Sequence, residues 1–229
     1  MAQFHFVEDY ERFVDNLVKQ YPIDEAMARA VGGSYDDVGE MELNILRHAG
    51  LKDGMAVFDL GCGSGRLASA LGRSGMDLDY LGTDIVQALL DYAKTKSPEH
   101  YRFIKHAALS IPAENSSVDV ACAFSVFTHL LHHETYQYLE AMRHAVKPGG
   151  RVVFSFLEFA DAGHWSIFEH TIHHQRMDVQ TPLNSFIERS VIDAWAQRIG
   201  FRVVEYINGN VGIGGGAPLG QSTAILERI

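Results

Sequence analysis

The stretch from residue 57 to residue 68 constrains the fold more than any other part of the chain. It reads Val-Phe-Asp-Leu-Gly-Cys-Gly-Ser-Gly-Arg-Leu-Ala: an apolar run with one acid, then glycine at every second position, then apolar residues at helical spacing. This order predicts a strand, a tight loop and a helix. Glycines let the backbone turn sharply and let a ligand lie against main-chain N–H groups at the positive end of the helix. We therefore expect this loop to bind a ligand, and a carboxylate-bearing ligand suits it.

The glycine spacing distinguishes this loop from two common nucleotide-binding loops. The dinucleotide-binding fingerprint requires its third glycine at position 66, which is Arg66. A phosphate-binding P-loop requires Gly-Lys-Ser or Gly-Lys-Thr, and the sequence contains no such run. Asp59 lies two residues before Gly61, where its carboxylate can hold a cation or an N–H donor of the ligand. Because Arg66 stands where that fingerprint requires a glycine, an NAD-dependent oxidoreductase is disfavoured.

The run Phe-Asp-Leu-Gly-Cys-Gly-Ser-Gly at residues 58–65 resembles the signature of the class I, Rossmann-like S-adenosylmethionine-dependent methyltransferases, of the type that acts on small molecules. An amphipathic helix over His133–Val146, the turn Lys147–Gly150 and the strand after it resemble the same family, so the resemblance covers about residues 55–156. It implies an α/β fold with a Rossmann-like, seven-stranded, mostly parallel sheet, an antiparallel last strand and helices on both faces.

The hydrophobic pattern predicts seven strands separated by helices. A glycine-rich connection at residues 208–220 joins the last two strands and is too short for a crossover helix, so these two strands should pair antiparallel. The fourth strand is strongly apolar and should be central in the sheet. The predicted strands are Met55–Leu60, Leu78–Thr83, Tyr101–His106, Ser117–Phe124, Arg151–Phe156, Phe201–Tyr206 and Ser222–Arg228.

The chain divides into two predicted parts. Helical patterns over Phe6–Gln20, Asp24–Val31 and Val38–Ala49 predict a helical segment at residues 1–50. The resemblance implies that this segment is a lid over cofactor and substrate; the alternative is that its helices simply cover one edge of the sheet. Residues 51–229 then form the S-adenosylmethionine-binding methyltransferase domain. Within it, residues 157–188 follow neither helical nor strand periodicity for long, and such an insertion is expected to shape the substrate pocket.

Composition disfavours several classes of partner. The formal net charge is −10 and no run of lysine or arginine exists, so nucleic acid is not an expected partner. No apolar run approaches the roughly 20 residues of a membrane span. The only two cysteines, Cys62 and Cys122, and the absence of a signal-peptide pattern predict a cytoplasmic protein without disulfides. A homodimer is compatible with these features.

The resemblance implies S-adenosyl-L-methionine as cofactor and S-adenosyl-L-homocysteine as product. Asp84, at the end of the second predicted strand, can accept hydrogen bonds from both ribose hydroxyls. Where the family often has an acid that binds the adenine amine, this chain has Ala107, which leaves backbone N–H groups near Ala108 and Leu109 as the expected adenine contacts. The predicted cofactor-binding residues are Asp59, Gly61, Cys62, Gly63, Gly65, Arg66, Asp84, Ile85, Ala108, Leu109, Phe124 and Ser125.

His129 is the candidate catalytic residue. It lies just beyond the carboxyl end of the fourth predicted strand, where open α/β sheets bind ligands, and an imidazole can accept a proton near neutral pH. The alternative is a structural histidine that caps the next helix or holds a loop. A solvated position is likewise the alternative to a cofactor contact for Arg66.

Tyr35, His164, Trp165 and His170 are the candidate substrate-binding residues, one in the helical segment and three in the insertion. His170 and His174 are four residues apart, which would place both rings on one face of a helix. Cysteine does not occur near them, and we predict no metal site.

These observations predict an enzyme that transfers the methyl group of S-adenosylmethionine to an oxygen or nitrogen atom of a small metabolite. A sulfonium methyl is already electrophilic, so the protein mainly has to position the acceptor atom. The alternative is a catalytically silent methyltransferase-like module that binds the cofactor or a partner protein. Ala107 is the residue that favours this alternative.

Overall fold

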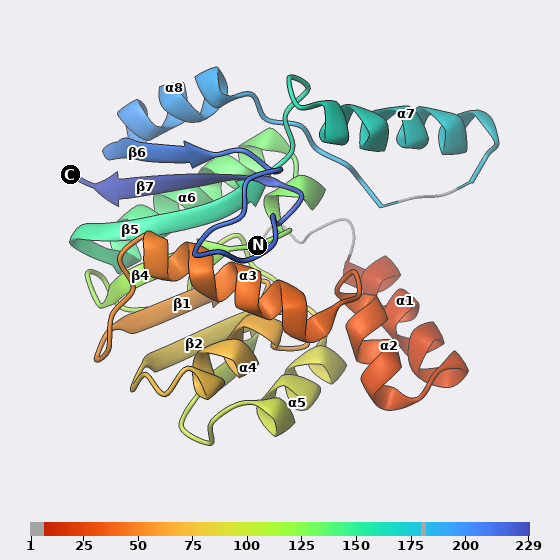
Figure 1. The fold of residues 1–229 in the computed structure, drawn as a ribbon, viewed down its shortest axis with the longest axis horizontal. Helices are drawn as coiled ribbons and strands as arrows, with labels where there is room; N and C mark the ends of the chain where they lie inside the picture. Colours follow the sequence, from red (N-terminus) through yellow and green to blue (C-terminus); the bar gives the residue numbers. More distant parts are fainter. Residues whose placement is uncertain (1–6, 180–181) are drawn as a thin grey trace.

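The computed structural model describes residues 7–179 and 182–229. A single seven-stranded sheet runs through the molecule, with helices on both of its faces (Figure 1). The strands are β1 (Ala56–Leu60), β2 (Asp79–Asp84), β3 (Arg102–Lys105), β4 (Val118–Ala123), β5 (Val146–Phe156), β6 (Phe201–Ile207) and β7 (Ser222–Arg228). The helices are α1 (Val7–Gln20), α2 (Ile23–Ala30), α3 (Tyr35–His48), α4 (Arg66–Arg73), α5 (Gln87–Lys96), η1 (Phe127–His129, a 3-10 turn), α6 (His132–Ala145), α7 (Ala162–Arg176) and α8 (Arg189–Ile199).

The strand order is β3-β2-β1-β4-β5-β7-β6. Neighbouring strands from β3 to β5 pair in parallel, whereas β7 pairs antiparallel with both β5 and β6. The prediction of a mostly parallel sheet with an antiparallel last strand is therefore confirmed, and β4 takes the central position. The parallel strands bring their carboxyl ends to one edge of the sheet, which is where such sheets bind ligands.

Two apolar layers hold the helices to the sheet. One layer packs α3, α4 and α5 against residues such as Val57, Cys122 and Val153. The other packs α6 and α8 against residues of the opposite face, such as Phe58 and Phe154. Because successive strand residues point to opposite faces, neighbouring residues such as Val57 and Phe58 serve different layers.

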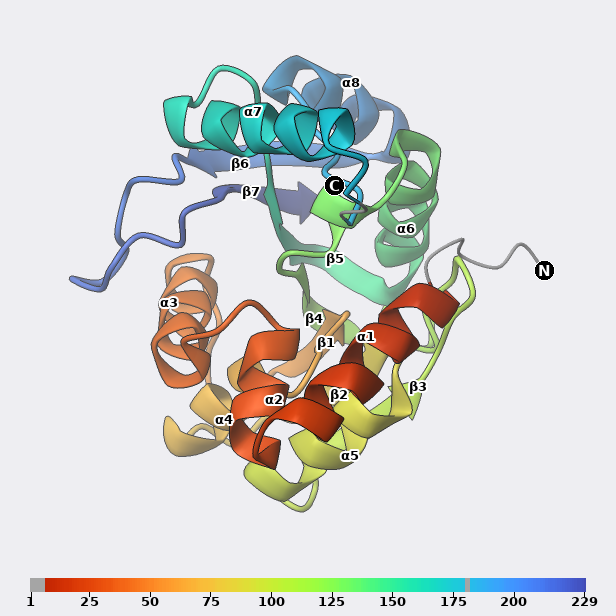
Figure 2. The ribbon, with the colours of Figure 1, turned by 90° about the vertical axis from the view of Figure 1, so that its right-hand side faces the viewer.

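The helices predicted in the amino-terminal segment are present, with α1 and α2 lying beyond the carboxyl edge of the sheet and α3 packing on its face (Figures 1 and 2). Phe6, the predicted first residue of the first helix, lies outside the described residues. Buried Val14 of α1 and Met27 of α2 pack against Val86 and Leu89 at the start of α5. These contacts attach the segment to the start of α5, just after β2.

The insertion contains a helix that the sequence pattern does not reveal. Helix α7 spans Ala162–Arg176 and projects from the body beyond the carboxyl edge (Figure 1). His164 is its only buried residue, so its apolar residues need not form the stripe that makes a packed helix recognisable. Asp161 caps the helix by accepting hydrogen bonds from the N–H groups of Gly163 and His164.

Strand β5 also differs from its prediction, because it begins at Val146 rather than Arg151. Its register against β4 shifts between Val118 and Val120. The predicted turn at residues 147–150 is therefore an irregularity inside the strand, and Lys147 there forms an ion pair with Asp119 of β4.

Candidate active site

The glycine loop lies between β1 and α4, and its shape requires glycine. Gly61, Gly63 and Gly65 have φ angles of 67°, 55° and 83°, in the left-handed region that other residues avoid. A Cβ at Gly61 would come within 2.5 Å of a methyl group of Val126, and one at Gly63 within 2.6 Å of a methyl group of Val31. The loop backbone therefore lies in close contact with the segment after β4 and with the end of α2.

Asp84, at the carboxyl end of β2, touches this loop. Its side chain is 7% exposed, and its two oxygens accept hydrogen bonds from the backbone N–H of Gly63 at 3.0 Å and of Val86 at 2.9 Å. Burial raises the pKa of the carboxyl to about 6, although these N–H groups oppose the rise. An ionised carboxylate offers about four acceptor positions, so two remain for the paired hydroxyls of a ribose. The residues present therefore fit the predicted adenosyl cofactor.

Asp59 is buried in β1, two residues before the first loop glycine. It accepts a hydrogen bond of 2.6 Å from the hydroxyl of Tyr80 on β2. Burial raises the pKa of Asp59 to about 7, while the bond from Tyr80 lowers it and the nearby carboxylate of Glu42 raises it. A cationic group bound near Asp59 would favour its ionised form. The sequence pattern did not identify Tyr80, because its partner is on another strand.

The amino-terminal helices contact the loop directly. The hydroxyl of Tyr35 donates to the carbonyl of Ser64 at 2.9 Å, and the Ser64 hydroxyl donates to the carbonyl of Met27 at 3.0 Å. Ile85, the predicted adenine contact, packs in one apolar cluster with Tyr10 of α1. Tyr35 therefore reaches the cofactor loop, rather than the insertion, in this structure.

Arg66 has two protein partners. Its guanidinium forms a buried ion pair with Glu42 of α3, with an N···O distance of 2.7 Å, and donates to the carbonyl of Val31 at 2.6 Å. The alternative prediction of a solvated Arg66 is wrong, because the side chain is buried. These partners account for Arg66 without a ligand and link α4 to α3 and to the end of α2.

The remaining predicted cofactor residues lie along the same sheet edge. Cys62 is buried beside Asp59, and burial raises the pKa of its thiol. The Ala108 carbonyl accepts a bond of 3.1 Å from the Tyr138 hydroxyl, and Leu109 packs against the apolar layer under α6. Phe124 is buried after β4, and Ser125 follows it with a φ of 58°.

His129 ends η1, beyond the carboxyl end of β4, and its side chain is exposed. Its Nδ1 lies 2.7 Å from the carbonyl oxygen of Leu183. Because a carbonyl only accepts, Nδ1 carries the proton, and Nε2 keeps a free lone pair. The geometry thus makes His129 hold a loop and also leaves it able to accept a proton.

Residues 183–187, which we call the return segment, run back from α7 to α8 along η1. The N–H of Ser185 donates to the carbonyl of Thr128 at 2.7 Å, and Nε2 of His132 lies 2.9 Å from the carbonyl of Phe186. The N–H of Ile187 donates to the carbonyl of Leu157 at 2.8 Å. The return segment therefore borders the candidate base.

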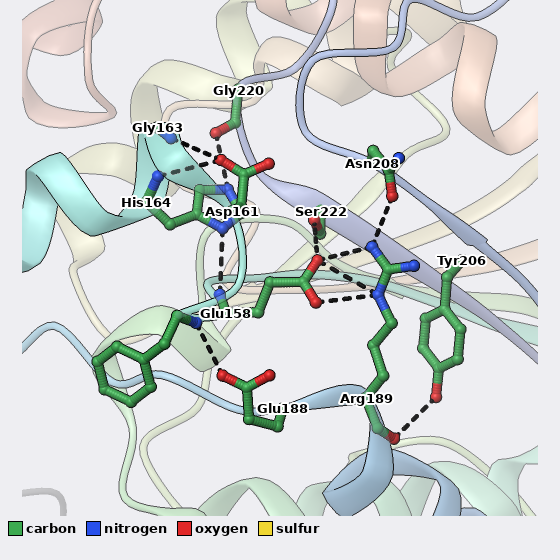
Figure 3. Close-up of polar contacts among 11 residues, drawn as sticks. Glu158, Asp161, Gly163, His164, Glu188, Arg189, Tyr206, Asn208, Gly220 and Ser222 are labelled. Carbon is green, nitrogen blue, oxygen red and sulfur yellow. Dashed lines mark hydrogen bonds and ion pairs between the residues drawn. The ribbon is translucent and has the colours of Figure 1, made fainter.

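His164 lies inside a polar cluster at the base of the insertion (Figure 3). It is 1% exposed; its Nδ1 accepts the N–H of Glu158 at 3.1 Å, and its Nε2 lies 3.2 Å from the carbonyl of Gly220. Both ring nitrogens are thus engaged with backbone groups. This geometry supports a structural role for His164 in place of the predicted substrate contact.

The same cluster holds an ion pair that the sequence pattern did not reveal. Glu158 lies at the start of the insertion, is 4% exposed, and accepts from the guanidinium of Arg189 at 2.7 and 2.9 Å (Figure 3). Ser222 donates to the same carboxylate at 2.6 Å. Burial alone would raise the pKa of Glu158, but Arg189 and Ser222 lower it below its usual value. The pair joins the two ends of the insertion.

Trp165 and His170 lie on exposed parts of α7. Trp165 is 45% exposed, and its ring contacts those of Phe159 and Phe168 with centroids 6.2 and 5.3 Å away. The rings of His170 and His174 are 3.9 Å apart, as expected for residues on one helix face. Among the residues that the structure describes, no group of three or more His, Cys, Asp or Glu side chains could hold a metal ion.

Part of the chain is similar to known methyltransferases. Residues 58–154 match the family model described as a methyltransferase domain. The biotin biosynthesis bifunctional protein BioHC of Cellvibrio japonicus is 25% identical over 79% of this chain and 32% of its own length. The ubiquinone biosynthesis O-methyltransferase of Acinetobacter baylyi is 32% identical over 52% of this chain and 50% of its own length. The chain thus spans half or less of the length of these two curated relatives.

Solved structures show the same fold. An S-adenosylmethionine-dependent methyltransferase from Methanosarcina mazei superimposes with a TM-score of 0.64, at 16% identity, over 80% of this chain and 97% of its own. The chain therefore has the fold of an S-adenosylmethionine-dependent methyltransferase, and its residues 58–154 match a methyltransferase domain. The predicted fold class is confirmed, and the predicted cofactor is the one named for this solved structure. In the described parts of the chain, no helix is both long and apolar enough to cross a membrane.

Proposed function

We propose that this chain transfers the methyl group of S-adenosylmethionine to an oxygen or nitrogen atom of a small metabolite. The observation that supports this most directly is the contact between Asp84 and Gly63. It joins a buried carboxylate, suited to ribose hydroxyls, to the glycine loop at the carboxyl edge of the sheet. Oxygen is favoured as the methylated atom, because a relative described above is an O-methyltransferase by name. A cytoplasmic location and a homodimeric state stay predictions.

In this proposal the cofactor lies along the carboxyl ends of β2, β1 and β4. Asp84 accepts hydrogen bonds from the ribose hydroxyls, and Ile85 borders the adenine together with the backbone of Ala108 and Leu109. The carboxylate of Asp59 attracts the positively charged part of the cofactor. The glycine loop approaches the ligand through Gly61, Cys62, Gly63 and Gly65, and Phe124 and Ser125 border its amino-acid end. When bound, the cofactor supplies a methyl group that a nucleophile can take up directly.

The protein's own part in the reaction is to hold the acceptor and to accept its proton. We propose that Nε2 of His129 accepts the proton that the acceptor molecule releases. This nitrogen is available because Nδ1, which donates to the Leu183 carbonyl, already carries the ring proton. Such proton transfer contributes about 10²- to 10⁴-fold to a rate. The exposed ring of Trp165 and the neighbouring ring of Phe159 offer an apolar surface for the rest of the acceptor.

Two measurements test the proposed function. Calorimetric titration with S-adenosylhomocysteine should show saturable binding at a single site. Incubation with S-adenosylmethionine labelled in its methyl group and a small-molecule extract should transfer label to at least one metabolite. Binding without transfer to any acceptor would favour the catalytically silent module. Absence of binding would overturn the assignment of the cofactor site.

A further inference from the structure

A hydrogen-bond chain links the carboxyl ends of β4 and β5 to the residue that precedes β7, which runs antiparallel to β5. It starts at Ser125, whose backbone is in the left-handed region that a serine rarely adopts. The N–H of Ser125 donates to the side-chain oxygen of Ser155 at 2.7 Å. Ser155 lies near the end of β5 and is fully buried. This contact fixes the position of Ser125 relative to β5.

The chain continues from Ser155 to Gln221, the residue before β7. Because the Ser155 oxygen accepts from Ser125, its own proton goes to Oε1 of Gln221, at 2.7 Å. The Ser125 hydroxyl donates to the same oxygen at 3.4 Å. Oε1 therefore accepts from two serine hydroxyls, and these bonds fix which way round the amide lies.

The other end of this amide is unused. Among the described residues, Nε2 of Gln221 has no hydrogen-bond partner, although it carries two N–H donors. The Gln221 side chain is half-buried rather than free in solvent. A half-buried glutamine held at its oxygen thus presents its donors at the edge where the sheet binds ligands.

The strand order places Gln221 on the acceptor side of the site. The cofactor elements β2 and β1 lie on one side of β4, whereas β5 and β7 lie on the other. Gly220, immediately before Gln221, accepts from His164 of the insertion. Gln221 therefore lies between the end of β4 and the base of the insertion, across β4 from Asp84.

We infer that Gln221 is a specificity residue for the methyl acceptor, and this inference rests on the proposed function. Its Nε2 donates to an oxygen atom of the acceptor that lies close to the methylated atom. The substrate class is thus a small molecule with such a hydrogen-bond-accepting oxygen, in a carbonyl, carboxylate or hydroxyl group. Ser155 and Ser125 are positioning residues that set the orientation of the amide.

The variant Gln221→Glu tests this inference. Glutamate has the same size and keeps an oxygen that accepts from both serines, but it has no N–H to donate. Gln197→Glu is the matched control, because it makes the same charge change at an exposed position of α8. Two quantities are measured for each protein: the affinity for S-adenosylhomocysteine, and the rate of label transfer over a dilution series of the small-molecule extract.

We expect Gln221→Glu to require about tenfold more extract for half-maximal transfer, since one hydrogen bond in a polar site is lost. Its maximal rate should change by less than about threefold, and its affinity for S-adenosylhomocysteine by less than about twofold. Gln197→Glu should match the wild type in all three. Ser155→Ala, which frees the amide, should shift half-maximal transfer in the same direction as Gln221→Glu but less.

Other outcomes would overturn the inference. If Gln221→Glu needs the same amount of extract as the wild type, Gln221 does not contact the acceptor. If its affinity for S-adenosylhomocysteine falls in parallel with transfer, Gln221 supports the cofactor site or the fold instead. If the wild type binds the cofactor product but transfers no label, the proposed function fails and this inference fails with it. If the wild type transfers label normally and Gln221→Glu behaves as the wild type does, this inference is rejected and the proposed function stands.

Discussion

The glycine-loop region and the insertion border the same edge of the sheet, but they are built in different ways. In the glycine-loop region, helix α4 buries its residues from Arg66 to Leu71, and the loop is bonded to β2, α2 and α3. In the insertion, helix α7 buries only His164. The insertion is attached to the body at its two ends, through Glu158 and the return segment.

This difference separates a fixed half of the site from an adaptable one. A loop that is bonded on every side is pre-organised for a single ligand, so little ordering is needed when it binds. An insertion attached to the body at its two ends can carry many different side chains without disturbing the sheet. We therefore expect changes in the glycine-loop region to affect cofactor affinity, and changes at the insertion to affect transfer or the stability of its attachment.

The largest effect should come from His129→Asn. The asparagine amide can still donate to the Leu183 carbonyl, in place of Nδ1, but it cannot accept a proton as Nε2 does. We expect transfer to fall at least about 100-fold while the affinity for S-adenosylhomocysteine stays within about twofold. Label transfer and calorimetry measure these quantities.

His133→Asn, at an exposed position of α6 nearby, is the control for this prediction. Raising the pH should restore part of the rate of His129→Asn, because an ionised hydroxyl acceptor needs no base. Unchanged transfer by His129→Asn would instead show that this histidine only holds the return segment.

Arg189→Met should have the next largest effect, and on stability rather than affinity. It leaves the buried carboxylate of Glu158 without its charged partner, which costs about 3 kcal/mol of unfolding free energy. Arg202→Met, which breaks an exposed pair with Glu227, should cost less than about 1 kcal/mol. Urea unfolding of both variants measures the difference. Equal losses would mean that the Glu158 pair does not anchor the insertion.

Asp84→Asn should weaken cofactor binding about 30-fold, because the amide loses the charge and half of the acceptor positions that a ribose would use. The unfolding midpoint should also fall, because the amide nitrogen cannot accept the backbone N–H that one carboxylate oxygen accepts. Asp37→Asn, at an exposed position in α3, is the control. Calorimetry with S-adenosylhomocysteine measures both affinities, and equal affinities for the two variants would remove Asp84 from the cofactor site.

The sequence predicted the glycine-loop region better than the insertion, for a physical reason. Strands such as β1 and β2 are short apolar runs, and the spacing from the glycines to Asp84 is a local property of the chain. The contacts that complete the site are not local. The partner of Arg66 is Glu42, and the partner of Ser155 is Gln221, 66 residues further on. Periodicity carries no information about such pairs.

Helix α7 escaped prediction because an exposed helix need not repeat apolar residues at helical spacing. His164 was predicted to contact the substrate because it lies in the insertion, which was expected to shape the substrate pocket, yet it is buried and bonded to two backbone groups. One signal could have indicated the helix: Asp161 lies just before it, and aspartate is a favoured amino-terminal cap.

Asp59→Asn should have the smallest effect, and pH should reveal it. The pKa of this carboxyl is 3.8 in its unperturbed state and about 7 in the fold, chiefly because of burial. Between about pH 4 and pH 7 the folded protein therefore keeps a proton that the unfolded chain has released, so the unfolding free energy falls as the pH rises. Asparagine cannot ionise and still accepts from Tyr80, so at pH 8 the variant should be about 1–2 kcal/mol more stable than the wild type. At pH 4 the two should be nearly equal.

Melting temperatures recorded from pH 4 to pH 8 measure this effect. The variant should still lose some stability as the pH rises, because the pKa of Asp84 is also raised, to about 6. This loss should be smaller than the loss in the wild type. The gain in stability should be accompanied by weaker binding of S-adenosylmethionine, because the carboxylate that favours its cationic part is gone. Identical pH profiles for variant and wild type would show that Asp59 is ionised throughout this range. A raised carboxyl pKa in the glycine-loop region would then rest on Asp84 alone, whereas in the insertion Arg189 keeps the pKa of the buried Glu158 low.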